Sequence, residues 1–241
     1  MRSKITYLFM ILILFLNLCG CAKSAQSNEN TQYIGIHTDY PVVTSLEDMR
    51  KVSTYILVGH FNGEYETWNM ARNPENLSEE DEKNRVEGRL YQFEVEKVLR
   101  GDVTEKTVAV NFTYSKAVES IVSNAEIDEE GNITKEATES KTYNYTVQDP
   151  LFIEPSTTDT YILFLLKNSQ QNNYYGAIEP FRIRLEGDKA VLETNLTSGK
   201  TAQETVTMED GQVFVVNMDV PTIEDFISGQ NAEEIMDLLT R

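Results

Sequence analysis

The chain has 241 residues, a formal net charge of −18 and two cysteines. This length accommodates one sizeable β domain or two small ones. So acidic a surface repels phosphate backbones, and we therefore exclude nucleic acid as a partner. Cys19 and Cys21 both lie near the N-terminus, which excludes a disulfide or a cysteine-based zinc site in the rest of the chain.

The first residues follow the pattern of a bacterial export signal. Two basic residues precede Ile5–Leu18, an uncharged apolar run that is shorter than the about 20 residues a membrane-spanning helix needs. The next motif, Leu-Cys-Gly-Cys at 18–21, resembles a bacterial lipobox. The resemblance implies cleavage after Gly20 and a lipid on Cys21, which would anchor the protein to the extracytoplasmic face of the cell membrane. A secretory signal with an incidental cysteine is the alternative.

Composition divides the chain into three parts. Residues 1–20 are the predicted lipoprotein signal peptide, and residues 21–32 are polar without an apolar period, which predicts a flexible tether. Residues 33–241 are predicted to form one β-rich domain. Within it we expect a barrel core over about 45–196, and a C-terminal hairpin and two helices within 203–240.

Two alternating runs around Gly101-Asp102 form the centre of the predicted sheet. Tyr91, Phe93 and Val95 share one face of the first run, and residues 108, 110 and 112 share one face of the second. Period-two alternation on both sides of a turn is typical of two antiparallel strands with one buried and one solvated face.

The remaining elements are assigned by the same criteria. We expect strands with tight turns, and short helices that begin at capping residues. The strands are predicted at 52–61 (ending near Gly63), 143–147, 160–166, 174–178, 181–185, 190–193, 206–208 and 213–216. Three helices are predicted: a short one that starts at Thr44-Ser45, one over Pro221–Ile227 and one over Asn231–Leu239. Between them, 73–84 is a polar excursion in which Ser78 caps one helical turn, and 115–141 is an acidic insertion with a small hairpin near Gly131.

The order of these elements carries a resemblance. Residues 55–59, 91–102, 107–110 and 161–165 resemble a pattern of uncharacterised bacterial secreted proteins and, more distantly, the OB-type barrel of the metalloproteinase-inhibitor and netrin-like class. The resemblance implies a mainly β fold, a small OB-like antiparallel barrel with added hairpins and short peripheral helices. The resemblance does not imply that this chain inhibits metalloproteinases, because that class inhibits through a free N-terminal cysteine and disulfides.

No catalytic or metal template is complete, so we predict no catalytic residue, metal site or cofactor. The residues at 198–201 end like a phosphate-binding loop but lack its first glycine, which favours a polar turn. Within the acidic loop 119–141, residues 126–133 have the spacing of acidic residues found in an EF-hand calcium-binding loop. The twelfth position of that loop, normally a glutamate ligand, is Ala137 here, so a solvated turn is favoured over calcium binding. His37 and His60 are the two histidines, and His60 is interpreted as a hydrogen-bonded residue at the rim of the barrel.

Four acids are the candidates for hydrolysis by carboxylates. Glu94 and Glu96 lie about 6.6 Å apart along one strand face, near the spacing of an inverting glycosidase, although alternation explains them more simply as the solvated face of the strand. Asp149 and Glu154 complete the set.

Aromatic side chains are the candidates for ligand binding. Trp68 near Arg72 predicts either a ligand platform or a plug at one end of the barrel. Tyr174, Tyr175 and Phe181 predict either a sugar or peptide surface or ordinary strand packing.

Two hypotheses about function follow. The first is a lipid-anchored, non-catalytic binding or structural module of the cell envelope, with membrane lipid as a partner through Cys21 and an envelope protein, peptide or glycan as ligand. The alternative is a carboxylate-dependent or metal-assisted cell-envelope hydrolase.

Overall fold

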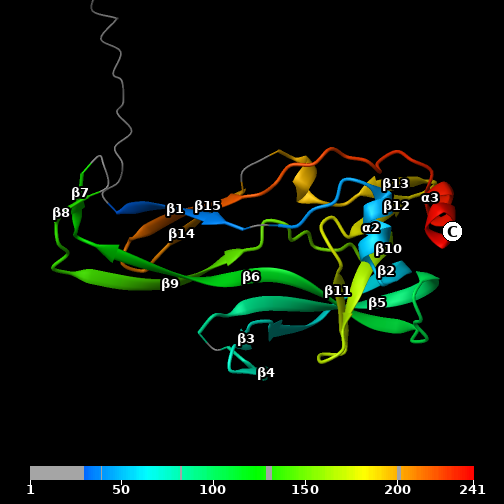
Figure 1. Cartoon of the computed structure of the whole chain (residues 1–241), viewed down its shortest axis with the longest axis horizontal. Helices are drawn as coiled ribbons and strands as arrows, with labels where there is room; N and C mark the ends of the chain where they lie inside the picture. Colours follow the sequence, from blue (N-terminus) through cyan, green and yellow to red (C-terminus); the bar gives the residue numbers. More distant parts are fainter. Residues whose placement is uncertain (1–29, 39, 82, 129–131, 200–201) are drawn as a thin grey trace, which may run out of the picture.

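A computed structural model of the chain describes residues 30–38, 40–81, 83–128, 132–199 and 202–241. The described part is mainly β, with two short α-helices (Figure 1). Its elements are β1 (Thr31–His37), α2 (Leu46–Val52), β2 (Tyr55–Asn69), β3 (Arg72–Asn73), β4 (Asn76–Glu80), β5 (Val86–Arg100), β6 (Thr107–Ser123), β7 (Glu126–Ile127), β8 (Ile133–Lys135), β9 (Ser140–Gln148), β10 (Thr160–Asn168), β11 (Asn173–Gly176), β12 (Arg182–Glu186), β13 (Lys189–Leu192), the 3₁₀ turn η1 (Asn195–Thr197), β14 (Ala202–Thr207), β15 (Val213–Asp219) and α3 (Ala232–Thr240).

The largest sheet of the described residues has eight strands, in the order β11-β6-β5-β2-β10-β12-β13 with β9 added beside β6. β11 pairs twice, in parallel with β6 and antiparallel with β10. The hydrogen-bonded pairing therefore runs from β11 through β6, β5, β2 and β10 back to β11.

The predicted central strand pair is confirmed. β5 and β6 are antiparallel, and Tyr91 lies opposite Val110 while Phe93 lies opposite Val108. These side chains are buried, whereas Gln92 on the opposite face is exposed. Both strands are longer than expected. β6 continues through the first part of the expected insertion and pairs with β9 along Ser115–Ser123.

β2 does not end near Gly63 as expected but runs on to Asn69. Several register shifts interrupt its pairing with β5, so the strand bends instead of stopping. Gly59 lies at one of these shifts, where a Cβ atom would be 1.9 Å from the carbonyl oxygen of Glu94. Only glycine allows the two strands to approach so closely.

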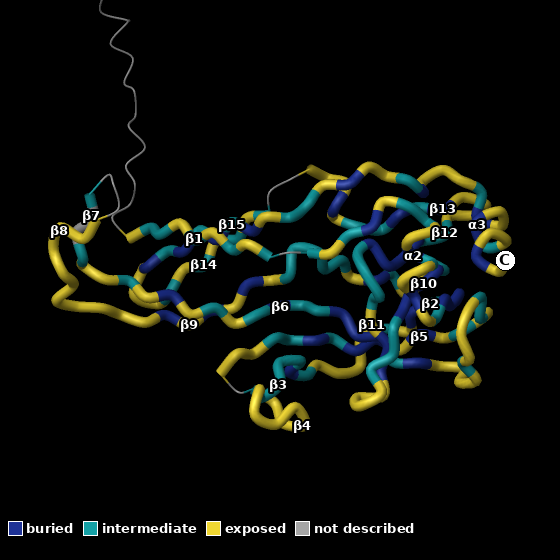
Figure 2. Tube along the Cα trace, in the orientation of Figure 1, coloured by how far each residue is buried: buried dark blue, intermediate teal, exposed yellow. Residues whose placement is uncertain are grey.

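The main hydrophobic core lies inside the large sheet. β10 is central, as its apolar sequence predicts, and pairs with β2, β12 and β11. Its residues Tyr161–Leu165 are fully buried, and α2 and α3 add Met49, Ile235 and Leu239 to the same cluster (Figure 2). The caps predicted for these two helices are confirmed: Ser45 accepts from the Asp48 amide, and Asn231 accepts from the amides of Glu233 and Glu234.

A second, smaller core lies at the far end of the elongated molecule (Figure 1). The predicted β14–β15 hairpin is confirmed, and β15 also pairs in parallel with β1. This three-stranded sheet packs on β9, where Phe214 lies between Tyr143 and Tyr145 at ring-centroid distances of 5.3 and 4.8 Å. Thr31 and Gln32, assigned above to the tether, are therefore part of a strand.

Two local predictions are wrong. Ser78 lies in β4 of a short β3–β4 hairpin and caps no helical turn. Pro221–Ile227 is not helical: Asp225 instead accepts from the amides of Ile227 and Ser228 in a turn. Burial of Ile223 and Ile227 in the main core holds this segment in an irregular path.

Candidate functional site

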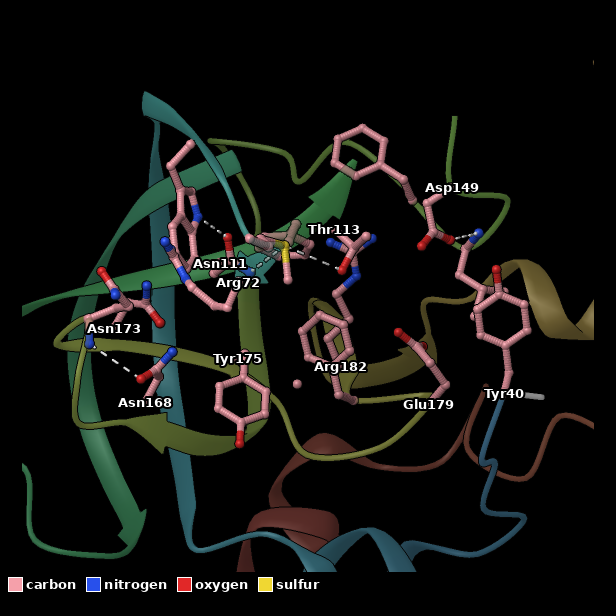
Figure 3. Close-up of a pocket in the computed structure, with 18 of the residues that line it drawn as sticks. Tyr40, Arg72, Asn111, Thr113, Asp149, Asn168, Asn173, Tyr175, Glu179 and Arg182 are labelled. Carbon is pink, nitrogen blue, oxygen red and sulfur yellow. Dashed lines mark hydrogen bonds between the residues drawn. The ribbon is translucent and has the colours of Figure 1, made fainter. Parts of the chain in front are cut away.

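A cavity of about 390 Å³ opens beside the large sheet (Figure 3). It lies within the size range of small-ligand sites. Six parts of the chain build its wall: the segment between β1 and α2, the end of β2 with the start of β3, the middle of β6, the segment after β9, the β10–β11 turn with β11, and the residues around β12 and after β13. The lining residues used below are Tyr40, Trp68, Met70, Arg72, Asn111, Thr113, Asp149, Asn168, Gln170, Gln171, Asn173, Tyr175, Glu179, Phe181, Arg182 and Glu193.

Trp68 and Arg72 form one wall of the cavity. The Arg72 guanidinium lies over the Trp68 ring, 4.9 Å from its centroid. The indole Nε1 donates to the Oδ1 atom of buried Asn111 at 2.7 Å. The long β2 carries Trp68 into the wall of the cavity.

Carboxamide side chains gather along the β10–β11 part of the wall. Asn168 Oδ1 accepts from the backbone amides of Gln170 and Gln171, which fixes the turn. Asn173 is only 3% exposed, and its carboxamide has no hydrogen-bond partner among the described residues. Its polar atoms are not among the fully buried atoms without a partner, so the carboxamide keeps access to the cavity and can bond to what enters it.

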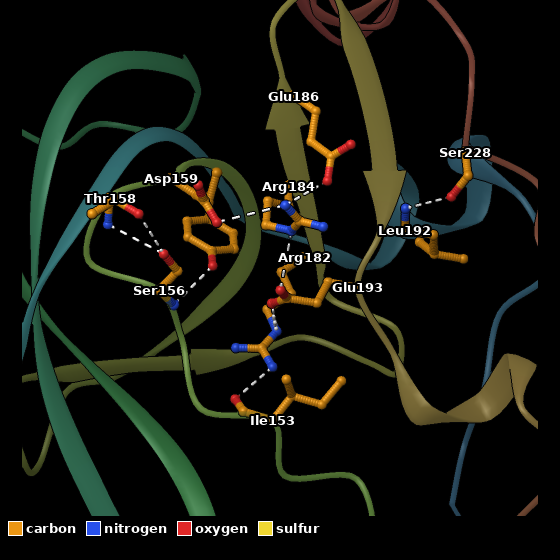
Figure 4. A network of polar contacts seen from close by, with 11 residues as sticks. Ile153, Ser156, Thr158, Asp159, Arg182, Arg184, Glu186, Leu192, Glu193 and Ser228 are labelled. Carbon is orange, nitrogen blue, oxygen red and sulfur yellow. Dashed lines mark hydrogen bonds and ion pairs between the residues drawn. The ribbon is translucent and has the colours of Figure 1, made fainter.

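Arg182 lies between this carboxamide wall and the acidic end of the cavity (Figure 3). Its side chain is 3% exposed, its Nε atom pairs with Glu193 at 3.0 Å and its Nη2 atom donates to the Ile153 carbonyl at 2.7 Å (Figure 4). Glu193 is shared with Arg184, at 3.5 Å. Glu193 therefore balances the charge of Arg182, whereas the Nη1 atom of Arg182 is buried and has no hydrogen-bond partner among the described residues.

The acidic end contains Asp149, Glu179 and the phenol of Tyr40 (Figure 3). Burial raises the pKa of Glu179 to about 8, against the opposing effect of Arg182 and with a further increase from Asp149. Burial also raises the pKa of Asp149, although the Leu151 amide donates to its carboxylate at 2.8 Å. Burial and the charge of Asp149 raise the pKa of Tyr40 to about 12. In the described part of the chain neither carboxylate forms an ion pair.

The structure does not bring the four predicted acids together. Glu94 and Glu96 are half exposed and flank His60, at 3.6 and 3.1 Å from its ring nitrogens. Glu154 accepts from the Tyr91 hydroxyl at 2.8 Å. Asp149 alone of the four lines the cavity.

Of the other predicted features, Tyr175 and Phe181 line this cavity and the rest of those within the described residues do not. His37 pairs with Asp219 at 2.6 Å in the small sheet. Gly20, Cys21, Lys200 and Thr201 lie outside the described residues, as do residues 129–131 of the loop considered for calcium. Tyr175 lines the cavity and is 39% exposed, and Phe181 packs beside it, whereas Tyr174 belongs to the core.

Sequence reasoning missed Glu179, Asn111, Asn173 and Arg182. Asn111, Glu179 and Arg182 each follow or interrupt a run of apolar residues, and a polar side chain in such a run was the available signal, whereas Asn173 follows a polar run and carried no such signal. The pattern alone does not show that these positions face a common cavity, because that depends on β11 pairing with both β6 and β10.

The arrangement favours binding of a polar ligand. Among the described residues, no group of three or more His, Cys, Asp and Glu side chains is placed to hold a metal ion. Within the same residues, no helix combines the length and the apolar character needed to cross a bilayer.

Comparisons with protein-family models, curated proteins and solved structures found no match to this chain.

Proposed function

We propose that this chain is a lipid-anchored, extracytoplasmic binding protein that holds a saccharide of the cell envelope in the cavity. Membrane lipid would be its partner through Cys21, after cleavage behind Gly20, as the lipobox-like residues at 18–21 imply. The observation that carries the saccharide assignment is the cavity wall, where Trp68 and Tyr175 stand beside a row of carboxamide side chains.

The chemistry of this wall suits a sugar. Sugar hydroxyls both donate and accept hydrogen bonds, and a carboxamide offers both functions in one group. The apolar faces of sugar rings pack on aromatic rings, which also present a polar edge. The net charge of −18 disfavours nucleic acid as an alternative polymer.

We further propose that β2, β5, β6, β11 and β10 form an OB-like barrel. The support is the pairing that returns to its first strand, together with the parallel pairing of β6 and β11. OB-type barrels present one sheet face to oligosaccharides or oligonucleotides, which fits a cavity lined from β2, β6 and β11.

The test is a glycan array probed with the purified full-length chain in detergent, followed by calorimetry with any glycan that binds. Trp68→Ala and Tyr175→Ala are each expected to weaken binding about tenfold or more, because each removes an aromatic face. Tyr65→Ala is the matched control, since Tyr65 is an exposed aromatic on β2 outside the cavity lining. Absence of glycan binding, or equal binding by all the variants, would overturn the proposal.

One observation favours a second candidate, a carboxylate-dependent hydrolase of envelope glycans. Asp149 and Glu179 line one cavity, and Glu179 has a pKa raised to about 8 by burial, as a general acid requires. Reducing-end release from envelope polysaccharides would be measured. This candidate requires turnover that Glu179→Gln abolishes while glycan binding persists, and it fails if wild type binds without turnover.

A further inference from the structure

The acidic end of the cavity has no cation to balance it. Three carboxylates line the cavity, and Glu193 is the one paired with Arg182 and Arg184. Asp149 and Glu179 remain, and no ion pair to either is found among the described residues. Because Glu179 is half-buried without a paired cation in the described chain, its carboxyl holds a proton at neutral pH, and an ammonium group that enters this end of the cavity would take the place of that proton.

The cations near this pair have other partners. Arg182 is held by Glu193 at 3.0 Å and by the Ile153 carbonyl at 2.7 Å, and only its Nη1 atom is buried without a hydrogen-bond partner among the described residues. Lys116 acts on Asp149 through its charge, but its Nζ atom donates to Thr38 at 3.4 Å. Neither cation neutralises Glu179 fully, because burial still raises the pKa of that carboxyl to about 8.

An independent feature shows that the same cavity is built for a ligand. Asn173 is 3% exposed and lines the cavity, and its carboxamide has no partner among the described residues. A carboxamide so placed can exchange hydrogen bonds with water for hydrogen bonds with a polar ligand that enters the cavity.

We propose that the cavity binds a saccharide that carries a free amino group, with the ammonium group between Asp149 and Glu179 and with ring hydroxyls at Asn173. This inference rests on the proposed function, because it names the class of saccharide that the cavity takes. A charge-assisted hydrogen bond to a carboxylate is stronger than one between neutral groups, so the amine sets the specificity. The net charge of −18 also attracts cationic ligands toward the protein.

The test compares two probes that differ only at their nitrogen atoms: a fully deacetylated glucosamine trimer and the corresponding fully acetylated trimer. Calorimetry with the full-length chain in detergent at neutral pH is expected to give about tenfold or more tighter binding of the deacetylated trimer. Glu179→Gln and Asp149→Asn are expected to remove most of this preference. Glu66→Gln is the control, because it removes the same charge from an exposed position on β2 outside the cavity lining.

The outcomes separate this inference from the proposed function. If both trimers bind equally, or the acetylated trimer binds more tightly, the cavity binds sugars without selecting an amine and the inference is wrong. If neither trimer binds while other glycans on the array do, the inference also fails and the proposed function stands. If no glycan binds at all, both fail. A preference retained in Glu179→Gln and Asp149→Asn would place the amine elsewhere and overturn the assignment of these residues.

Discussion

Single residues decide the two most specific features of this molecule: the close approach of β2 to β5 and the chemistry of the cavity. Gly59 permits the first, because a side chain there would meet the backbone of β5. Glu179 dominates the second, because its carboxyl lies in the cavity without a paired cation among the described residues. Both residues lie in stretches that otherwise follow ordinary strand patterns.

Gly59→Ala is expected to destabilise the fold by about 3 kcal/mol or more, because its Cβ would lie 1.9 Å from the Glu94 carbonyl oxygen and force the two strands apart. Denaturant unfolding measures the change. Gly35→Ala is the matched control: Gly35 also lies in a strand, and its added Cβ would have its nearest neighbour at 3.7 Å. Similar costs for the two variants would contradict the steric argument.

Glu179 makes the fold less stable as pH rises. Its pKa is raised from 4.5 to about 8, so the folded state holds a proton that the unfolded state has already released in this range. Stability is therefore highest below pH 4.5 for this group and is lost as pH rises through about 8. Asp149 and Arg182 are the charged groups that act on it, and burial has the largest effect.

Relative to wild type, Glu179→Gln should therefore gain stability with rising pH, by about 2 kcal/mol in total after allowance for solvent in the cavity. Thermal unfolding from mildly acidic to mildly alkaline pH measures this difference. Parallel curves for wild type and Glu179→Gln would refute the assignment. Glu66→Gln should give a curve parallel to that of wild type.

At the scale of elements, β6 joins the two halves of the molecule. Its first half pairs with β5 in the large sheet, and its second half pairs with β9 beneath the small sheet (Figure 1). The two halves have separate hydrophobic clusters, one around β10 and one around Phe214. Separate clusters allow separate unfolding, because loss of packing in one need not expose the other.

Phe214→Ala should unfold the small sheet in preference to the large one. The substitution removes the ring that packs against Tyr143 and Tyr145, a loss of about 3–5 kcal/mol for a buried Phe. Hydrogen exchange should show lost protection in β1, β14 and β15 with little change in β2 and β10. Uniform loss over all strands would show that the two clusters unfold together. Val215→Ala, on the other face of β15, should have a smaller effect.

At the scale of the whole molecule, the large and small sheets lie at opposite ends of an elongated body (Figure 2). β1, the first described strand, belongs to the small sheet. The cavity lies in the other half, against the large sheet.

Cys21→Ala tests the anchor. Wild type should gain the mass of a diacylglyceryl group, lose residues 1–20 and partition into detergent, whereas Cys21→Ala should remain a longer precursor without lipid. Intact-mass analysis with detergent phase separation distinguishes the two. Identical behaviour of both proteins would remove the basis for the proposed localisation.

The sequence by itself determined the elements whose cause is local. Alternation predicted β5, β6 and β9, because successive side chains of a strand point to opposite faces, and a continuous apolar run predicted β10. Ser45 and Asn231 predicted two helix starts, because a cap bonds amides only two or three residues away. The same logic failed at Pro221–Ile227, where burial of two isoleucines outweighs the local preference for a helix.

Only the tertiary structure decided where strands end and which polar residues meet. β2 continues past Gly63 because β5 pairs with it through several shifts in register, and this continuation brings Trp68 to the cavity. β1 pairs with β15 across most of the chain, a contact that no local pattern encodes. Asp149 and Glu179 share one cavity wall because separate connections bring them there. Long-range pairing fixes these features, and alternation specifies the face of a residue but not its partner.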